Sequence, residues 1–171
     1  KTKESNFGIK MVSRAGEIEK MEEVARVVAQ SNTRLFFGMG SSGSMAQYGA
    51  RILSNYGMLT LAITDPFQPQ PISERDYSKT LIILLSVSGE TEGVLTQANY
   101  YRQNGAKIVA ITANSASTLA QIADYSLTYD IPENKVGSLN FTSQIPVVYL
   151  LEQLGEKTSK LVYHPEISHE I

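Results

Sequence analysis

The chain has 171 residues, of which 42% are hydrophobic and 19% are charged, values typical of one well-buried globular domain. Its net charge of −2 provides no basic face for nucleic acid, and the absence of cysteine excludes disulfides and cysteine chemistry. No apolar run reaches the roughly 18 residues of a membrane span and no signal peptide is visible, so we expect a cytoplasmic protein without membrane contact.

Helical and strand-like segments alternate along the chain. Ile18, Met21 and Val24 recur at helical spacing, whereas the apolar run Arg34–Met39 is typical of a strand buried on both faces. Thr80–Leu85 (TLIILL) is the most apolar run and is expected to be the central strand. The expected helices cover 14–30, 44–56, 91–104, a short segment capped by Ser117 and a last helix to about Leu154, and the expected strands cover 34–39, 58–64, 80–85, 107–112 and 125–129.

The end of the chain is less regular. Residues 132–140 indicate a loop, and the last helix must hold Pro146 in its first turn, where proline is tolerated. From Gly155 onward the periodicity is weak, which predicts a short extension or disorder. We therefore predict a helical lead-in over 1–33, a central domain over 34–155 and a C-terminal tail over 156–171.

The alternation of strands and helices predicts an α/β fold. Right-handed β–α–β units would build a five-stranded parallel sheet with helices on both faces, a three-layer αβα sandwich. In such sheets, ligands bind beyond the carboxyl ends of the strands, where the chain switches direction.

Two serine-rich turns occupy such strand ends, Gly38–Ser44 (GMGSSGS) and Ser86–Thr91 (SVSGET). Glycine lets the backbone turn tightly, and the helix that follows each turn presents unpaired N–H groups beside the hydroxyls. Neither turn contains lysine or arginine. The two turns therefore predict one anion site, best suited to a phosphate held by dipoles and hydroxyls.

Other interpretations of the first turn remain open. Gly38, Gly40 and Gly43 also fit the dinucleotide-binding fingerprint, with Asp65 near the place of a ribose-binding acid. A purely structural tight turn is a further alternative. The P-loop is excluded, because no Gly-Lys-Ser/Thr follows either glycine turn.

The second turn is more specific. Ser88 or Thr91 could act as a helix N-cap with no ligand present, but one cap accounts for one hydroxyl and not for three. Both turns, with their spacing, resemble the SIS (sugar isomerase) domain, a phosphosugar-binding module with a flavodoxin-like doubly wound sheet, over about 34–154. The second motif, Ser-x-Ser-Gly-Glu-Thr, matches at 86–91. The resemblance implies that a sugar phosphate is bound by Gly40, Ser41, Ser42, Ser86, Val87, Ser88, Gly89 and Thr91, with the N–H groups of Val87 and Gly89 on the phosphate.

Within this superfamily, the chain is most similar to the effector domain of RpiR-type bacterial transcription regulators, in its helical lead-in, in 65–68 (DPFQ) and in 132–143. The similarity implies that a sugar phosphate controls DNA binding by a helix-turn-helix module that would precede this chain, which starts without methionine. It also implies a homodimer or homotetramer, with the first and last helices at the interface. The chain departs from relatives at Phe67, where histidine is common, and at Val136–Gly137, where arginine is common.

An enzyme is the alternative. A single-domain aldose–ketose isomerase such as a 6-phospho-3-hexuloisomerase needs a positioned base, and the candidates are Glu90, Glu133 and His164. Asp65 and Glu133 are also candidate contacts to the sugar. We expect a sensor without catalytic residues, metal or cofactor, and a ligand-free interaction module is a third alternative.

Overall fold

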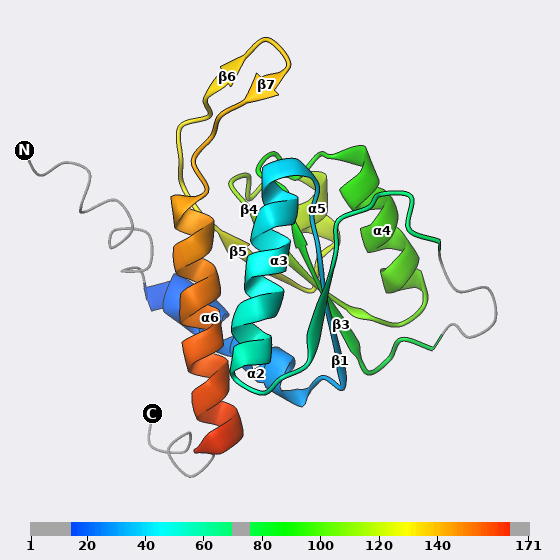
Figure 1. The fold of residues 1–171 in the computed structure, drawn as a ribbon, viewed down its shortest axis with the longest axis vertical. Helices are drawn as coiled ribbons and strands as arrows, with labels where there is room; N and C mark the ends of the chain where they lie inside the picture. The colour runs from blue at the N-terminus through cyan, green and yellow to red at the C-terminus, as the bar shows by residue number, and fades with distance from the viewer. Residues whose placement is uncertain (1–14, 70–75, 165–171) are drawn as a thin grey trace, which may run out of the picture.

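Five parallel strands form the centre of the molecule, in the order β2-β1-β3-β4-β5 (Figure 1). The computed structural model describes residues 15–69 and 76–164. The sheet confirms the predicted α/β class, and the run TLIILL is its central strand, as expected. The strands are β1 (Thr33–Phe37), β2 (Thr60–Ile63), β3 (Thr80–Leu85), β4 (Lys107–Thr112) and β5 (Tyr125–Thr128).

Helices cover both faces of the sheet. One face carries α2, α3 and α6, and the other carries α4 and α5 (Figure 1). Within the described residues, no helix is both long and apolar enough to span a bilayer. The helices are α2 (Ala15–Gln30), α3 (Gly40–Asn55), α4 (Glu92–Gln103), α5 (Thr118–Ile122) and α6 (Ile145–Tyr163).

The central strand explains the three layers. All six residues of β3 are buried, because successive side chains of a strand point to opposite faces and both faces are covered by helices. Ile83 packs in the cluster under α2, α3 and α6, whereas Ile82 and Leu84 pack in the cluster under α4 and α5. Strand β3 thus belongs to two hydrophobic clusters at once.

The first helix is part of the main core. Met21, Val24, Ala25 and Val28 of α2 are buried in the same cluster as Leu150 and neighbouring residues of α6. The helix predicted as a lead-in therefore packs on the sheet and on the last helix like any other core helix.

The last helix is longer than predicted. It continues past Leu154 to Tyr163, and Gly155 and Thr158 lie buried inside it. A Cβ at Gly155 would lie 2.4 Å from Cγ2 of Ile52. The absence of a side chain at Gly155 thus allows α6 to pack closely against α3, beside which it lies in Figure 1.

Two further boundaries differ from the prediction. Helix α3 begins at Gly40 and not at Ser44, because the glycine- and serine-rich residues before Ser44 form its first turn. The expected loop before the last helix contains a two-stranded hairpin, β6 (Lys135–Val136) and β7 (Leu139–Asn140), which extends from the body (Figure 1). Pro146 lies in the first turn of α6, as predicted.

The strand order determines where a ligand can enter. Strand β1 lies between β2 and β3, so the chain passes to one side of β1 and then to the other. The carboxyl ends of β1 and β3 therefore flank the point where the winding direction reverses, where α/β sheets bind ligands.

Candidate anion-binding site

A cavity of about 370 Å³ opens at this reversal point. It lies between the two serine-rich turns and the segment that carries the β6–β7 hairpin. Its lining residues are Met39, Gly40, Ser41, Ser42, Leu85, Ser86, Val87, Ser88, Thr91, Val94, Lys135, Ser138, Asn140, Thr142 and Gln144.

The first turn brings the start of α3 to the end of β1. A Cβ at Gly38 would lie 2.4 Å from the carbonyl oxygen of Ser42, and one at Gly43 would lie 2.9 Å from the carbonyl oxygen of Gly38. Close packing of strand against helix thus requires both glycines, which accounts for the spacing that also fitted a dinucleotide fingerprint. Gly40 has a φ of +57°, a conformation that glycine adopts without strain.

The second turn is held by its own hydroxyls. The N–H of Gly89 donates to Oγ of Ser86 at 3.0 Å, and the hydroxyls of Ser86 and Thr91 share a hydrogen bond of 2.9 Å. The N–H of Glu90 donates to Oγ of Ser88 at 3.2 Å. All three predicted hydroxyls therefore gather within one turn.

Two helix N-termini meet at the cavity without side-chain caps. The N-cap residue of α3 is Met39, which has no side chain able to accept these bonds, and neither it nor Thr91 of α4 makes a side-chain cap bond. The hydroxyl of Thr91 bonds to Ser86 instead. In α4 the N–H of Val94 already donates to the carbonyl oxygen of Thr91 at 3.0 Å. First-turn N–H groups that no side chain caps, and the positive ends of both helix dipoles, remain for an anion.

The structure brings most of the predicted binding residues together. Gly40, Ser41, Ser42, Ser86, Val87, Ser88 and Thr91 all line the cavity. Gly89 does not line it, because its N–H, expected to face the phosphate, bonds to Ser86 inside the turn.

The two predicted sugar contacts lie outside the lining. The carboxylate of Asp65 accepts from the N–H of Phe67 at 2.8 Å, which closes a local turn. Glu133 pairs with Lys135 at 2.5 Å between Oε1 and Nζ. Lys135, and not Glu133, faces the cavity and is its one cationic lining residue in the described chain.

The hairpin segment supplies residues that sequence reasoning missed. Among them, Oε1 of Gln144 is buried and has no hydrogen-bond partner in the described residues. A buried acceptor without a donor is costly, and a ligand hydroxyl would satisfy it. The sequence singled out 132–143 only for its resemblance to RpiR-type regulators and not as a binding wall. The lining residues from this segment are Lys135, Ser138, Asn140, Thr142 and Gln144.

The candidate bases do not reach the cavity. Both carboxylate oxygens of Glu90 accept hydrogen bonds from Thr118, and these bonds lower the pKa of Glu90. His164 follows the far end of α6, whose 19 residues span roughly 28 Å from the cavity end (Figure 1). His169, the other histidine of the sequence, lies outside the described residues.

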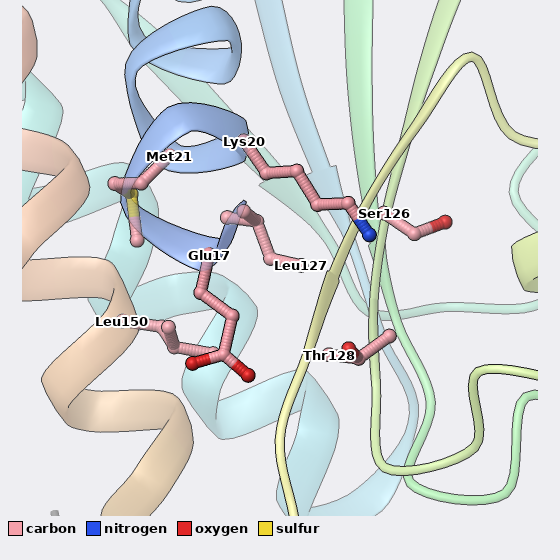
Figure 2. A pocket seen from close by; sticks show the side chains of 7 residues that line it. All are labelled: Glu17, Lys20, Met21, Ser126, Leu127, Thr128 and Leu150. Atoms are coloured by element: carbon pink, nitrogen blue, oxygen red, sulfur yellow. The ribbon is translucent and has the colours of Figure 1, made fainter. Parts of the chain in front are cut away.

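A second hollow lies between α2, β5 and α6 (Figure 2). The carboxylate of Glu17 points toward Leu150 and Thr128, while Lys20 extends toward Ser126. Its volume of about 20 Å³ holds a single water and excludes a sugar.

A third hollow, of about 330 Å³, lies beside α2 and β5. Its lining holds two acidic residues, Glu23 and Asp124, and one lysine, Lys20, and the excess of negative charge disfavours a phosphate. Of these hollows, the cavity at the reversal point is thus the one suited to an anion.

Comparison with known proteins identifies the family. The SIS domain matches residues 28–154, which is most of the chain. The chain belongs to the SIS domain family. The HTH-type transcriptional regulator RpiR of Escherichia coli is 24% identical over 144 residues, which cover 84% of this chain and 49% of the regulator. The SIS domain described here is therefore related to those of RpiR-type regulators.

An enzyme and a solved structure are also similar to this SIS domain. The 3-hexulose-6-phosphate isomerase of Mycobacterium gastri is 33% identical over 106 residues, which cover 62% of this chain and 51% of the enzyme. The Vibrio vulnificus NanR protein complexed with ManNAc-6P matches 96% of this chain and 63% of its own, with a TM-score of 0.78 and 19% identity. This chain spans about half the length of the curated relatives RpiR and the isomerase.

Proposed function

We propose that this SIS domain is the sugar-phosphate sensor of an RpiR-type transcription regulator. The cavity at the reversal point carries the proposal, because two uncapped helix N-termini and two hydroxyl-bearing turns converge there. The ligand would control the DNA affinity of a helix-turn-helix module attached to this domain.

The cavity has the features of a phosphate site. Hydroxyls of Ser41, Ser42, Ser88 and Thr91 line it beside the first-turn N–H groups, and Lys135 adds a positive charge on the opposite wall. Its volume of about 370 Å³ lies within the range of small-molecule sites. We assign the phosphate to the turns and the sugar to the hairpin segment.

The lining favours a sensor over an isomerase. An aldose–ketose isomerase must move a proton between neighbouring carbons, which requires a base in contact with the substrate. No aspartate, glutamate or histidine lines the cavity in the described part of the chain. A sensor needs recognition of the sugar and a different affinity in two conformations, but no base.

The isomerase remains the second candidate. The observation in its favour is the 33% identity to the Mycobacterium gastri enzyme over 106 residues. In that case Glu90 would have to leave Thr118 to reach a substrate.

We further propose that the domain forms a homodimer or a homotetramer through α2 and α6. These helices pack against each other, and Ile18, Val162 and Tyr163 expose apolar surface on them. Movement of these helices on ligand binding would change the position of an attached DNA-binding module.

Thermal unfolding in the presence of pentose, hexose and amino-sugar phosphates tests the sensor proposal. A ligand at 100 times its dissociation constant should add about 2.7 kcal/mol, which raises the melting temperature by roughly 5–10 °C. Free sugars and inorganic phosphate are the controls, and NMR after long incubation shows whether the sugar is converted. Conversion of the ligand would establish the isomerase instead.

A double variant tests the site assignment. The double change Ser88→Ala and Thr91→Ala removes two hydroxyls from the turn to which the phosphate is assigned. It should raise the dissociation constant of the ligand at least about tenfold. Ligand binding as tight as that of the parent would refute the assignment.

A further inference from the structure

We infer that Glu90 is a positioning residue that ties the anion-binding turn, 86–91, to the first turn of α5. This inference rests on the proposed function, because it concerns the turn to which the phosphate is assigned. It gives the acidic residue of the Ser-x-Ser-Gly-Glu-Thr motif a role other than that of a base.

The tie consists of two short hydrogen bonds. The N–H of Thr118 donates to Oε1 of Glu90 at 2.7 Å, and Oγ1 of Thr118 donates to Oε2 at 2.7 Å. One carboxylate thus holds both the backbone and the side chain of the first residue of α5. Charge-assisted bonds of this length are among the stronger ones in proteins.

Backbone and packing contacts also join the turn 86–91 to the start of α5. The N–H of Leu119 donates to the carbonyl oxygen of Gly89 at 3.1 Å. A Cβ at Gly89 would lie 2.1 Å from Oγ of Ser117, so the turn rests directly on the residue that caps α5. The turn and the start of α5 therefore form one unit.

A further contact fixes the other side of the turn. The carbonyl oxygen of Val87 accepts from the N–H of Ala113 at 3.0 Å and from Oγ1 of Thr112 at 3.1 Å. Carbonyls of the turn are thus directed to the β4–α5 connection, away from an anion that would repel them. Glu90 does the same for its own negative charge, which would otherwise lie free beside the anion.

The geometry does not suit a base. Both oxygens of Glu90 are engaged by Thr118, and Glu90 does not line the cavity. The hydrogen bonds from Thr118 also lower the pKa of the carboxyl, which makes it a weaker proton acceptor.

Glu90→Gln and Glu90→Ala form the decisive pair. Glutamine can accept from the N–H of Thr118 and donate to its hydroxyl, so it preserves the tie and removes only the charge. Alanine removes both. We expect Glu90→Ala to weaken binding of inorganic phosphate, followed by NMR titration, by about three- to tenfold, the effect of one or two lost hydrogen bonds. Glu90→Gln should bind within about twofold of the parent, or more tightly.

Thr118 provides a matched pair on the partner side. Thr118→Ser keeps the hydroxyl and should bind phosphate like the parent, whereas Thr118→Val loses the donor to Oε2 and should lie between the parent and Glu90→Ala. A Glu90→Gln protein as weak as Glu90→Ala would overturn the inference, because charge and not position would then matter.

Hydrogen exchange at Leu119 tests the tie without any ligand. The N–H of Leu119 should exchange faster in Glu90→Ala than in the parent, and its exchange rate in Glu90→Gln should equal that of the parent. Equal exchange in all three proteins would overturn the inference. A parent that binds neither inorganic phosphate nor any of the sugar phosphates, with the expected exchange pattern, would refute the proposed function and leave the tie supported.

Discussion

The two walls of the cavity are built in different ways. The turn wall, formed by 38–44 and 86–91, follows the buried carboxyl ends of β1 and β3 and depends on glycines that touch their neighbours. The hairpin wall, formed by 135–144, is largely exposed, and β6 and β7 pair only with each other. One wall is part of the core and the other is attached to it.

This difference fits the two parts of a sugar phosphate. A phosphate is the same in every ligand of the class, so a wall fixed by the sheet can bind it with backbone N–H groups and hydroxyls. The sugar varies, and exposed connecting segments accept sequence changes with little effect on the fold. We therefore expect substitutions in the turn wall to alter stability and affinity together, and those in the hairpin wall to alter mainly selectivity.

Glycines with positive φ offer the largest contrast. Gly89 has a φ of +68° and no room for a Cβ, whereas Gly137, at the hairpin turn, has a φ of +61° and no atom within 4 Å of an added Cβ. Gly89→Ala should cost about 2–4 kcal/mol from backbone strain and overpacking, and abolish ligand binding. Gly137→Ala should cost about 1 kcal/mol from strain alone. Thermal unfolding measures both, and equal losses would remove the contrast.

Serines of the two walls give the next contrast. Ser86 is 3% exposed and its hydroxyl accepts from the N–H of Gly89, so Ser86→Ala leaves a buried donor unpaired and should cost about 1–3 kcal/mol. The matched change Ser138→Ala, on the exposed hairpin, should stay within about 0.5 kcal/mol. Denaturant titration compares the two. A Ser138→Ala protein as unstable as Ser86→Ala would show that the hairpin is part of the core.

Gln144 tests whether the hairpin wall recognises the sugar. Its buried oxygen has no partner in the described residues, so Gln144→Met should leave stability unchanged or raise it by up to about 1 kcal/mol. The same change should reorder affinities among sugar phosphates and leave inorganic phosphate unaffected. Titration calorimetry with two sugar phosphates and phosphate decides. An equal loss for all three ligands would place Gln144 on the phosphate instead.

Lys135 should give the smallest effect on stability. Its ion pair with Glu133 is half exposed, and such pairs contribute about 0–1 kcal/mol. Lys135→Met should weaken the binding of a sugar phosphate several-fold at low salt. The difference in affinity between the parent and this variant should shrink as salt screens the charge. Affinities at two salt concentrations measure this effect. A difference that does not depend on salt would exclude a charge contact.

The turn wall was visible in the sequence because its causes are local. Glycine, serine and threonine clustered at strand ends fit only a few interpretations, namely a tight turn, a helix cap or an anion site. The structure brings Ser41, Ser88 and Thr91 together at one cavity. The contacts of Gly89 and Glu90 depend on residues far away in the sequence. Their partners, Ser117 and Thr118, follow another strand, and only the pairing of β3 with β4 brings them into contact.

The sequence predicted Asp65 and Glu133 as sugar contacts because both are acidic residues in loops near the turns. The structure shows that each carboxylate has a nearby partner, the N–H of Phe67 and the ammonium of Lys135. Oxygens satisfied in this way do not need to face the cavity. Gln144 could not be distinguished from any other helix-start residue until its burial was known.

The sequence by itself determined the α/β class, the central strand, the SIS resemblance and the residues of the turn wall, because hydrophobic period and turn chemistry act over a few residues. Tertiary structure alone decided three matters: the strand order that joins the turns, the close packing of α3 and α6 at Gly155, and the hairpin wall. Each depends on contacts between segments far apart in the chain, and a local pattern carries no information about such contacts.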